Sequence, residues 1–336
     1  MYESYYGFSA KPFGLHPDPH FFYGSKGHKR AMAYLDYGLA QGEGFIVITG
    51  EVGAGKTTLV RNMLNGLKAS QQIVAAHIVN THLGADDTLR MVLAGFGLEA
   101  EDANKSALLT RLERFLRACE AKGQRALLVV DEAQNLTART VEELRMLSNF
   151  QTDQRSLLQT FLLGQPELRA TMHGADMQQL RQRVIATYHL GPMDAGETVE
   201  FIEHRLRTVG WRGVPSFTAE AHAAIYGYSG GIPRIINHLC DRLLLMGYLE
   251  EMHAYDEADV ASVIKDIAAE FDAPPEVLAA AEDAAVLALE ADGYPDLVDE
   301  RLTRLEKSMA QVLHVLRKVV RRSRNESTAD LEPPHV

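Results

Sequence analysis

A glycine-rich segment between an apolar run and a helical pattern is the feature that most restricts the fold of this chain. Residues 44–49 (GFIVIT) form a continuous apolar run, and the pattern from Lys56 to Leu67 is helical. Between them, residues 50–57 (GEVGAGKT) match the pattern G-x-x-x-x-G-K-[ST]. Glycines let the backbone fold so that successive N–H groups and the helix N-terminus face an anion. The sequence therefore predicts a strand–loop–helix unit that binds phosphate groups.

The pattern assigns a role to each part of this loop. Lys56 is expected to neutralise the β and γ phosphates of a nucleoside triphosphate, and the Thr57 hydroxyl is expected to coordinate Mg²⁺. The alternative is an ordinary glycine-rich turn, which is disfavoured because a strand and a helix flank the motif on the required sides. We therefore expect ATP and Mg²⁺ as cofactors. The expected nucleotide-binding residues are Gly50, Glu51, Val52, Gly53, Ala54, Gly55, Lys56, Thr57 and Thr58.

Two carboxylates follow a second apolar run. Residues 126–130 (ALLVV) lead directly into Asp131 and Glu132, and ligands of open parallel sheets lie at the carboxyl ends of the strands. Asp131 is expected to hold Mg²⁺, largely through water, and Glu132 is expected to orient and deprotonate an attacking water. The alternative is that Asp131 only begins a loop and caps a helix. With the phosphate loop upstream, the pair favours nucleotide hydrolysis.

Apolar runs alternate with helical patterns through the first part of the chain. Near-continuous apolar runs separated by helices predict a parallel, doubly wound α/β sheet of roughly five strands, covered on both faces. From about Asp194 the strand signals disappear, and four helices are expected at 197–208, 219–228, 233–249 and 257–269. The expected strands are 44–49, 73–79, 126–130, 158–163 and a short one near 186–190. A helix at 26–40 is expected before the first strand, and helices at 56–67, 106–122 and 138–150 are expected between the strands.

These patterns predict six segments. They are an aromatic segment with a leading helix at 1–43, the α/β nucleotide-binding domain at 44–192, a helical lid at 193–271, an acidic linker at 272–296, a coiled-coil helix at 297–324 and a disordered tail at 325–336. The coiled coil rests on apolar residues that alternate at spacings of four and three from Val298 to Val319. The alternative for this helix is an amphipathic helix that docks on its own domain.

Charge is distributed unevenly along the chain. Residues 1–249 carry 25 acidic and 25 basic side chains, residues 250–300 have a net charge of −15, and residues 301–336 have a net charge of +4. The neutral main body does not favour nucleic acid as a partner, since nucleic-acid-binding domains usually carry a basic excess. The basic end either forms a solvated face or contacts anionic lipid or acidic protein.

The sequence also bears on location. The two cysteines, Cys119 and Cys240, cannot form a disulfide framework. The first residues do not resemble an export signal, and no run approaches eighteen uninterrupted apolar residues. We therefore expect a cytoplasmic protein without a transmembrane segment that can associate peripherally with the inner membrane.

Taken together, several segments resemble a known family. They are GEVGAGKTT (50–58), LLVVDEAQNL (127–136), LLGQPELR (162–169), LRQRV (180–184) and SGGIPRIINHLCDR (229–242), and they resemble the AAA+ ATPases of the general-secretion-pathway component A type. Residues 5–39 resemble the branch found at exosortase/PEP-CTERM loci, which are linked to exopolysaccharide export. The ATPases that regulate DNA transposases are more distantly similar. The resemblance covers about residues 1–270 and implies a P-loop AAA+ fold with a helical lid.

The resemblance implies further roles. Gln165 falls at the sensor position, where it helps to place water, although commoner family members use Asn, Ser or Thr there. Arg181 or Arg183 corresponds to the arginine finger that reaches a neighbouring subunit's nucleotide, and Arg234 corresponds to the second sensor, which meets the γ-phosphate. The alternative for Gln165 is a polar residue that only ends a strand. The alternative for Arg181 and Arg183 is that they form ion pairs at the surface, and the alternative for Arg234 is an arginine on a helix surface. A finger that acts on a neighbour implies a side-by-side, ring-like homo-oligomer.

Two questions stay open at this stage. The aromatic residues Phe13, Phe21, Phe22 and Tyr23 either pack in the core or line the adenine pocket.

The expected function is an ATP-hydrolysing motor or regulator that acts on envelope export or polysaccharide assembly proteins at the inner membrane. The alternatives are a DNA-associated ATPase of the transposition-regulator type and a nucleotide-dependent scaffold that hydrolyses little.

Overall fold

The computed structural model of the chain describes residues 1–16, 18–68, 72–79, 84–100, 104–153, 155–174 and 177–272. The chain divides into two units, residues 1–267 and residues 268–336, and all sites discussed below lie in the first. The expected acidic linker, coiled-coil helix and tail lie, from residue 273 onward, outside the described residues. These three expectations stay predictions.

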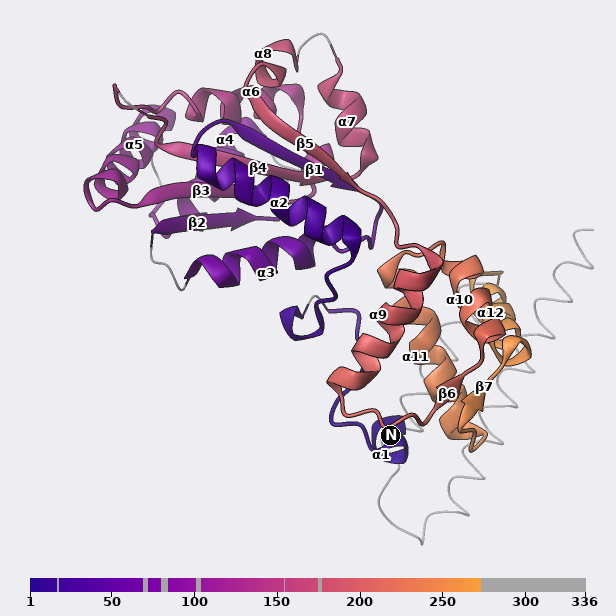
Figure 1. The fold of residues 1–336 in the computed structure, drawn as a ribbon. Coiled ribbons are helices and arrows are strands. Elements are labelled where there is room, and N and C mark those ends of the chain that lie inside the picture. The colour runs from indigo at the N-terminus through magenta and orange to yellow at the C-terminus, as the bar shows by residue number, and fades with distance from the viewer. Residues whose placement is uncertain are drawn as a thin grey trace, which may run out of the picture. The chain divides into compact units, whose positions relative to one another are not determined.

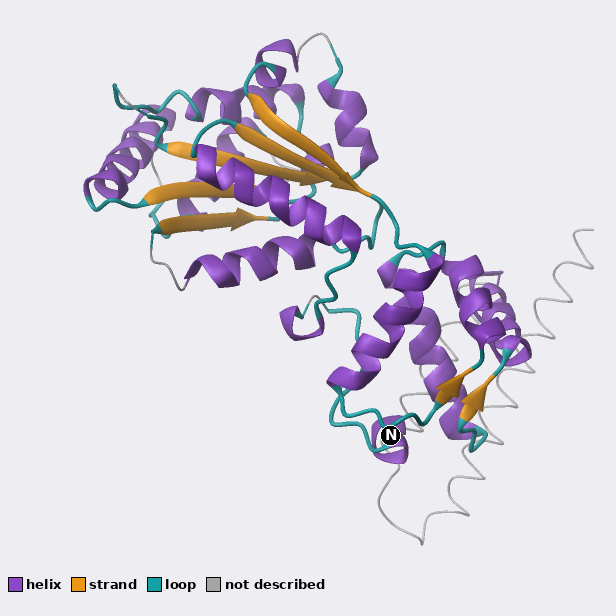
Figure 2. Ribbon diagram, viewed as in Figure 1, coloured by secondary structure: helices purple, strands orange, loops and turns teal. Residues whose placement is uncertain are grey.

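Five parallel strands form the central sheet (Figures 1 and 2). They are β1 (Phe45–Gly50), β2 (Ile73–Ile78), β3 (Arg125–Val130), β4 (Leu158–Gly164) and β5 (Val184–Leu190), in the order β2-β3-β4-β1-β5. In a parallel sheet all carboxyl ends meet at one edge. Because β4 lies between β1 and β3, the residue after β4 comes between the segments that follow the other two. The predicted parallel sheet is confirmed.

Helices cover both faces of this sheet, as predicted. One face packs against α2 (Lys26–Gln41) and α3 (Lys56–Lys68). The other packs against α4 (Ala85–Gly95), α5 (Lys105–Ala121), α6 (Ala138–Leu147), α7 (Pro166–Met172) and α8 (Gln178–Arg181). Alternate side chains of β1 serve the two faces: Ile46 joins the first cluster and Val47 joins the second. Helices α4, α7 and α8 were not predicted.

The second half of this unit is helical. It contains α9 (Ala195–Thr208), α10 (Ala219–Ser229), α11 (Pro233–Leu249) and α12 (Glu257–Asp272), so the four predicted helices are confirmed. They share a core of their own. The expectation that no strand follows Asp194 is wrong, because β6 (Ser216–Phe217) and β7 (Ala254–Tyr255) form a parallel pair. Strands of two residues are too short to show an alternating pattern.

The first 25 residues pack mainly on these four helices. They contain a short helix, α1 (Tyr2–Tyr6), and a 3-10 turn, η1 (Pro19–Phe21), where the sequence predicts an irregular segment. The Tyr6 hydroxyl donates to the Met252 carbonyl oxygen at 3.0 Å. Phe13 is only 1% exposed and belongs to the core of the helical region. The leading segment then enters α2, which packs on the sheet, so it joins both parts of the unit.

Candidate functional site

The phosphate loop follows β1 and ends where α3 begins at Lys56. Gly53 and Gly55 have φ values of +83° and +95°, in the region that favours glycine. Lys56 is 7% exposed, and its Nζ donates to the carbonyl oxygens of Gly50 at 2.7 Å and Glu51 at 2.9 Å. Burial lowers the pKa of Lys56, and the neighbouring carboxylates oppose this shift. The loop thus holds the Lys56 ammonium group against its own carbonyl oxygens.

The first predicted acid meets this loop directly. Thr57 Oγ1 donates to Asp131 Oδ2 at 2.7 Å, and the Glu132 backbone N–H donates to Asp131 Oδ1 at 3.0 Å. His77 Nε2 lies 3.7 Å from Asp131 Oδ2. Burial raises the pKa of Asp131, but His77, the Thr57 hydroxyl and the Glu132 amide together lower it below its ordinary value. Asp131 is therefore held as a carboxylate.

This pair fits the expected metal. A threonine hydroxyl and a carboxylate are hard oxygen donors, and Mg²⁺ is bound in proteins by one or two carboxylates together with waters and phosphate oxygens. Thr57 stands at the start of α3, immediately after the lysine that would face the phosphates. Thr57 and Asp131 would hold Mg²⁺, and the bound ion would neutralise charge on the phosphates.

The second acid is held by two glutamines. Glu132 has a φ of 54°, a left-handed conformation that is uncommon outside glycine. Its Oε2 accepts from Gln134 Nε2 at 2.6 Å and lies 3.4 Å from Gln165 Nε2. Gln165 follows β4, which lies between the strands that carry the loop and the acids. The structure thus brings Gln165 to Glu132, and its role as a sensor remains a proposal.

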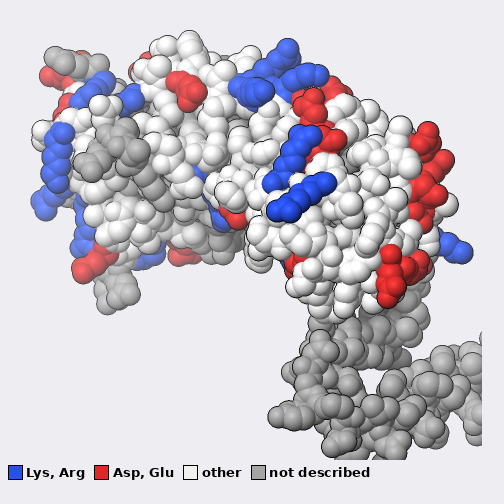
Figure 3. Space-filling model, turned by 60° about the horizontal axis from the view of Figure 1, so that its bottom comes forward, with Lys and Arg blue, Asp and Glu red and all other residues white. Residues whose placement is uncertain are grey.

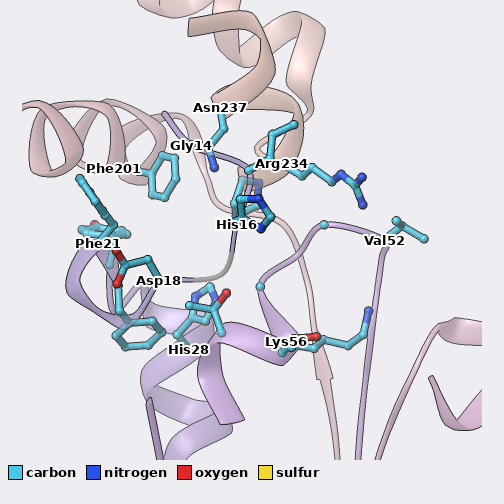
Figure 4. A pocket seen from close by; sticks show the side chains of 18 of the residues that line it. Gly14, His16, Asp18, Phe21, His28, Val52, Lys56, Phe201, Arg234 and Asn237 are labelled. Carbon is cyan, nitrogen blue, oxygen red and sulfur yellow. The ribbon is translucent and has the colours of Figure 1, made fainter. Parts of the chain in front are cut away.

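A pocket extends from the phosphate loop to the leading segment (Figure 4). The phosphate loop and the segments after β3 and β4 contribute Val52, Gly53, Gly55, Lys56, Thr57, Thr58, Glu132 and Gln165 to its lining. The far end, away from Val52 and Lys56, includes Gly14, Phe21 and Phe201. The residues His16, Phe22, Tyr23, His28, Arg205 and Asn237 also line the pocket. The leading aromatic residues therefore differ in their positions. Phe21, Phe22 and Tyr23 line the pocket, whereas Phe13 packs in the core.

His28, in the first turn of α2, lies against the phosphate loop. Its Nδ1 lies 2.7 Å from the Ser25 hydroxyl, and a Cβ added at Gly55 would lie 2.7 Å from its Nε2. Burial lowers the pKa of His28 to about 4, so the ring is neutral at pH 7. The loop can approach this closely because residue 55 has no side chain.

Arg205, on α9, binds the backbone of the leading segment. Its Nε donates to the Pro12 carbonyl oxygen at 2.5 Å and its Nη2 to that of Gly14 at 3.2 Å. The guanidinium lies 4.9 Å from the ring centre of Phe21 and 5.5 Å from that of Phe201. Burial lowers the pKa of Arg205 to about 10. The far wall of the pocket therefore depends on this arginine.

Arg234 joins the helical region to the loop. It is the second residue of α11, and its backbone N–H donates to the Gly53 carbonyl oxygen at 3.3 Å. Its side chain lines the pocket, and in Figure 4 its guanidinium and the Lys56 ammonium both point to the right of the view. This placement supports the proposal that Arg234 contacts the phosphates.

The two candidate finger residues lie elsewhere. The Arg183 guanidinium donates to the Ser148 hydroxyl at 2.6 Å and to the Asn149 side-chain oxygen, just after α6. Arg181 donates to the carbonyl oxygens of Met172 and Gly174, at the end of α7. Both arginines thus bind helix ends within their own chain, and a role toward a neighbour's nucleotide remains a proposal.

The comparisons with known proteins agree with this fold. Residues 39–172 match the AAA domain family. The solved structure of Cdc6p from Pyrobaculum aerophilum aligns with a TM-score of 0.58 at 14% identity, over 79% of this chain and 70% of that one. The Aeropyrum pernix ORC1 protein, in a complex with DNA, aligns with a TM-score of 0.57 at 14% identity, over 88% and 81%. The chain has the P-loop AAA+ fold.

A curated relative shares more sequence with this AAA+ chain. General secretion pathway protein A of Aeromonas hydrophila is 38% identical over 262 residues, which are 78% of this chain and 47% of the relative. The chain thus spans about half the length of that protein. This match agrees with the resemblance to the general-secretion type and does not bear on the exosortase/PEP-CTERM branch. In the described part of the AAA+ chain, no helix combines the length and the apolar character needed to cross a membrane.

Several residues at the site were not assigned from the sequence, among them Gln134, the partner of Glu132, and the pocket residues His28, Arg205 and Asn237. Asn237 stands one turn after Arg234 on α11, is 7% exposed, and its Oδ1 has no hydrogen-bond partner among the described residues. A motif search does not find such residues, because their neighbours are distant in the sequence.

Proposed function

We propose that this chain binds ATP with Mg²⁺ and hydrolyses it. The observation that carries the proposal is the convergence of Lys56 and Thr57, at the start of α3, with Asp131 and Glu132, at the end of β3. An ammonium, a hydroxyl and two carboxylates at one edge of a parallel sheet are the groups that phosphoryl transfer to water requires.

Each residue has a defined task in this proposal. The Lys56 Nζ exchanges its bonds to the loop carbonyls for phosphate oxygens, and Arg234 adds a second cation. The Glu132 carboxylate accepts a hydrogen bond from the attacking water and takes its proton as the water oxygen bonds to the γ-phosphorus. The bond from that phosphorus to the β–γ bridging oxygen breaks in the same step, and ADP leaves with this oxygen. Gln165 helps to place that water. The bound Mg²⁺ supplies charge neutralisation, for which Thr57 and Asp131 provide the oxygen ligands.

We further propose that the active form is a homo-oligomer. In this arrangement Arg183 or Arg181 leaves its helix-end contacts and faces the nucleotide of the neighbouring subunit. Hydrolysis then changes the relation between the sheet and helices α9–α12 through the contact of Arg234 with Gly53.

The proposed setting is an envelope export system. The relative named General secretion pathway protein A supports a role in export, and the resemblance of residues 5–39 supports the exopolysaccharide and exosortase/PEP-CTERM setting. The chain would act in the cytoplasm or at the inner face of the inner membrane, on export or polysaccharide assembly proteins. On the face drawn in Figure 3, acidic and basic side chains lie close together, which does not favour nucleic acid as the partner.

Subunit complementation tests the oligomer. Lys56→Ala removes nucleotide binding but keeps the arginines, and Arg183→Ala keeps the loop but removes one candidate finger. If Arg183 acts on a neighbour, the two inactive variants regain turnover when mixed, because some interfaces then pair an intact loop with an intact finger. The same mixture with Arg181→Ala distinguishes the two arginines. Full activity of both arginine variants alone would contradict the proposal.

A further inference from the structure

Gln134 uses both ends of its side-chain amide at the candidate site. It lies in the 3-10 turn η2 (Ala133–Asn135), directly after the two acids. Its Nε2 donates to Glu132 Oε2 at 2.6 Å, and its Oε1 accepts the backbone N–H of Gln165 at 3.0 Å. One side chain therefore connects the carboxylate after β3 with the main chain after β4.

The chemistry of the two partners fixes which way this amide points. A backbone N–H can only donate, so it requires the Gln134 oxygen, and an ionised carboxylate can only accept, so it requires the Gln134 nitrogen. Reversing the amide would place two donors together at one end and two acceptors together at the other. The orientation is thus determined by the hydrogen bonds on both sides, and the carboxylate of Glu132 is held against a rigid support.

The end of β4 is shaped to receive this amide. A Cβ added at Gly164 would lie 3.0 Å from Gln134 Oε1 and 2.8 Å from Leu168 Cδ2. Gly164 is buried at the last position of β4, and Gln165 begins α7 as its N-cap. The absence of a side chain at residue 164 leaves room for the Gln134 oxygen to reach the backbone of the next residue.

We propose that Gln134 is the positioning residue for Glu132 and that it couples the orientation of this carboxylate to the start of α7. This inference rests on the proposed hydrolysis and adds the residue that orients the general base, Glu132. A displacement of the main chain at Gln165 moves the Gln134 oxygen, and the same rigid amide moves the Glu132 carboxylate. Gln134 does not itself contact the phosphates, so it acts on the chemical step and not on nucleotide binding.

The test separates turnover from binding. Gln134→Leu keeps a side chain of similar size and removes both hydrogen bonds. We expect kcat to fall by roughly ten- to a hundredfold, as for the loss of a hydrogen bond to a charged group, while the Kd for ATP stays within about twofold. Gln134→Glu keeps an acceptor for the Gln165 N–H but places a carboxylate against Glu132, and we expect it to lose at least as much activity.

The matched control is Asn135→Leu, which changes the next amide in the same turn. It should keep the turnover of the unmodified protein. In a Glu132→Gln background, Gln134→Leu should cause no further loss, because it acts through Glu132. Hydrogen exchange supplies a readout apart from activity: the Gln165 amide should exchange faster in Gln134→Leu.

The outcomes are distinct. If the unmodified protein does not hydrolyse ATP, the proposed function fails and the inference fails with it. If it hydrolyses ATP and Gln134→Leu retains its kcat, the inference alone is overturned. An equal further loss in the Glu132→Gln background, or a loss of ATP affinity that matches the loss of kcat, would also overturn it, because either result assigns Gln134 a general structural role.

Discussion

Replacing Gly53 by alanine should separate α11 from the phosphate loop. Gly53 has a φ of +83°, and its missing Cβ would lie 2.4 Å from the Arg234 Cβ. The left-handed backbone costs an alanine about 1–2 kcal/mol. The contact adds about 1–3 kcal/mol, because the Arg234 Cβ is attached to the helix backbone and moves only if α11 moves. We therefore expect Gly53→Ala to lower the free energy of unfolding by about 2–5 kcal/mol.

Thermal unfolding and nucleotide titration measure this effect. For a chain of this size each kcal/mol corresponds to about 1–2 °C, so the midpoint should fall by at least about 2 °C. ATP affinity should fall by about tenfold as Arg234 moves away. The control is Gly66→Ala in α3, where a Cβ would meet nothing within 4 Å and should stabilise the helix by up to about 1 kcal/mol. An unchanged midpoint and unchanged ATP affinity in Gly53→Ala would refute the reasoning.

Three further predictions concern the pocket walls. Because burial lowers the folded pKa of His28 to about 4, the unfolded chain takes up this proton first; the free energy of unfolding should fall by up to about 3 kcal/mol as the pH drops from 6.5 to 4. Urea unfolding should show a flatter pH dependence in His28→Gln, and an identical one would contradict this. Arg205→Met should weaken binding of a fluorescent ATP analogue by about tenfold, whereas Arg207→Met, on the exposed side of the same helix, should not; equal effects would remove Arg205 from the pocket wall. Arg234→Ala should reduce turnover and leave sedimentation unchanged, and normal kinetics would exclude it from the site.

The sequence predicts the sheet and the phosphate loop well for a physical reason. Strands buried on both faces appear as continuous apolar runs, such as residues 45–48 of β1. The phosphate loop is a local motif, so its residues are recognisable without knowledge of distant neighbours. The two-residue strands β6 and β7 are missed because they are too short for any periodicity.

Contacts between distant residues could not be predicted in the same way. Gln134 and Gln165 meet only because β4 lies beside β3 in the sheet, an order that the sequence does not display. Arg205 binds the carbonyl oxygens of Pro12 and Gly14, and nothing in α9 alone indicates these partners. Gln165 could be placed near Glu132 through the family resemblance, which already contains the strand order.

A single-turnover experiment tests the central claim most directly. Purified protein in excess over labelled Mg²⁺·ATP is followed for bound nucleotide and for released phosphate, alongside Glu132→Gln. The account predicts that both proteins bind ATP with similar affinity and that only the unmodified chain converts it to ADP, at a rate at least about a hundredfold above that of the variant. Binding without conversion in both proteins would favour a scaffold, and the absence of binding by the unmodified chain would contradict the account as a whole.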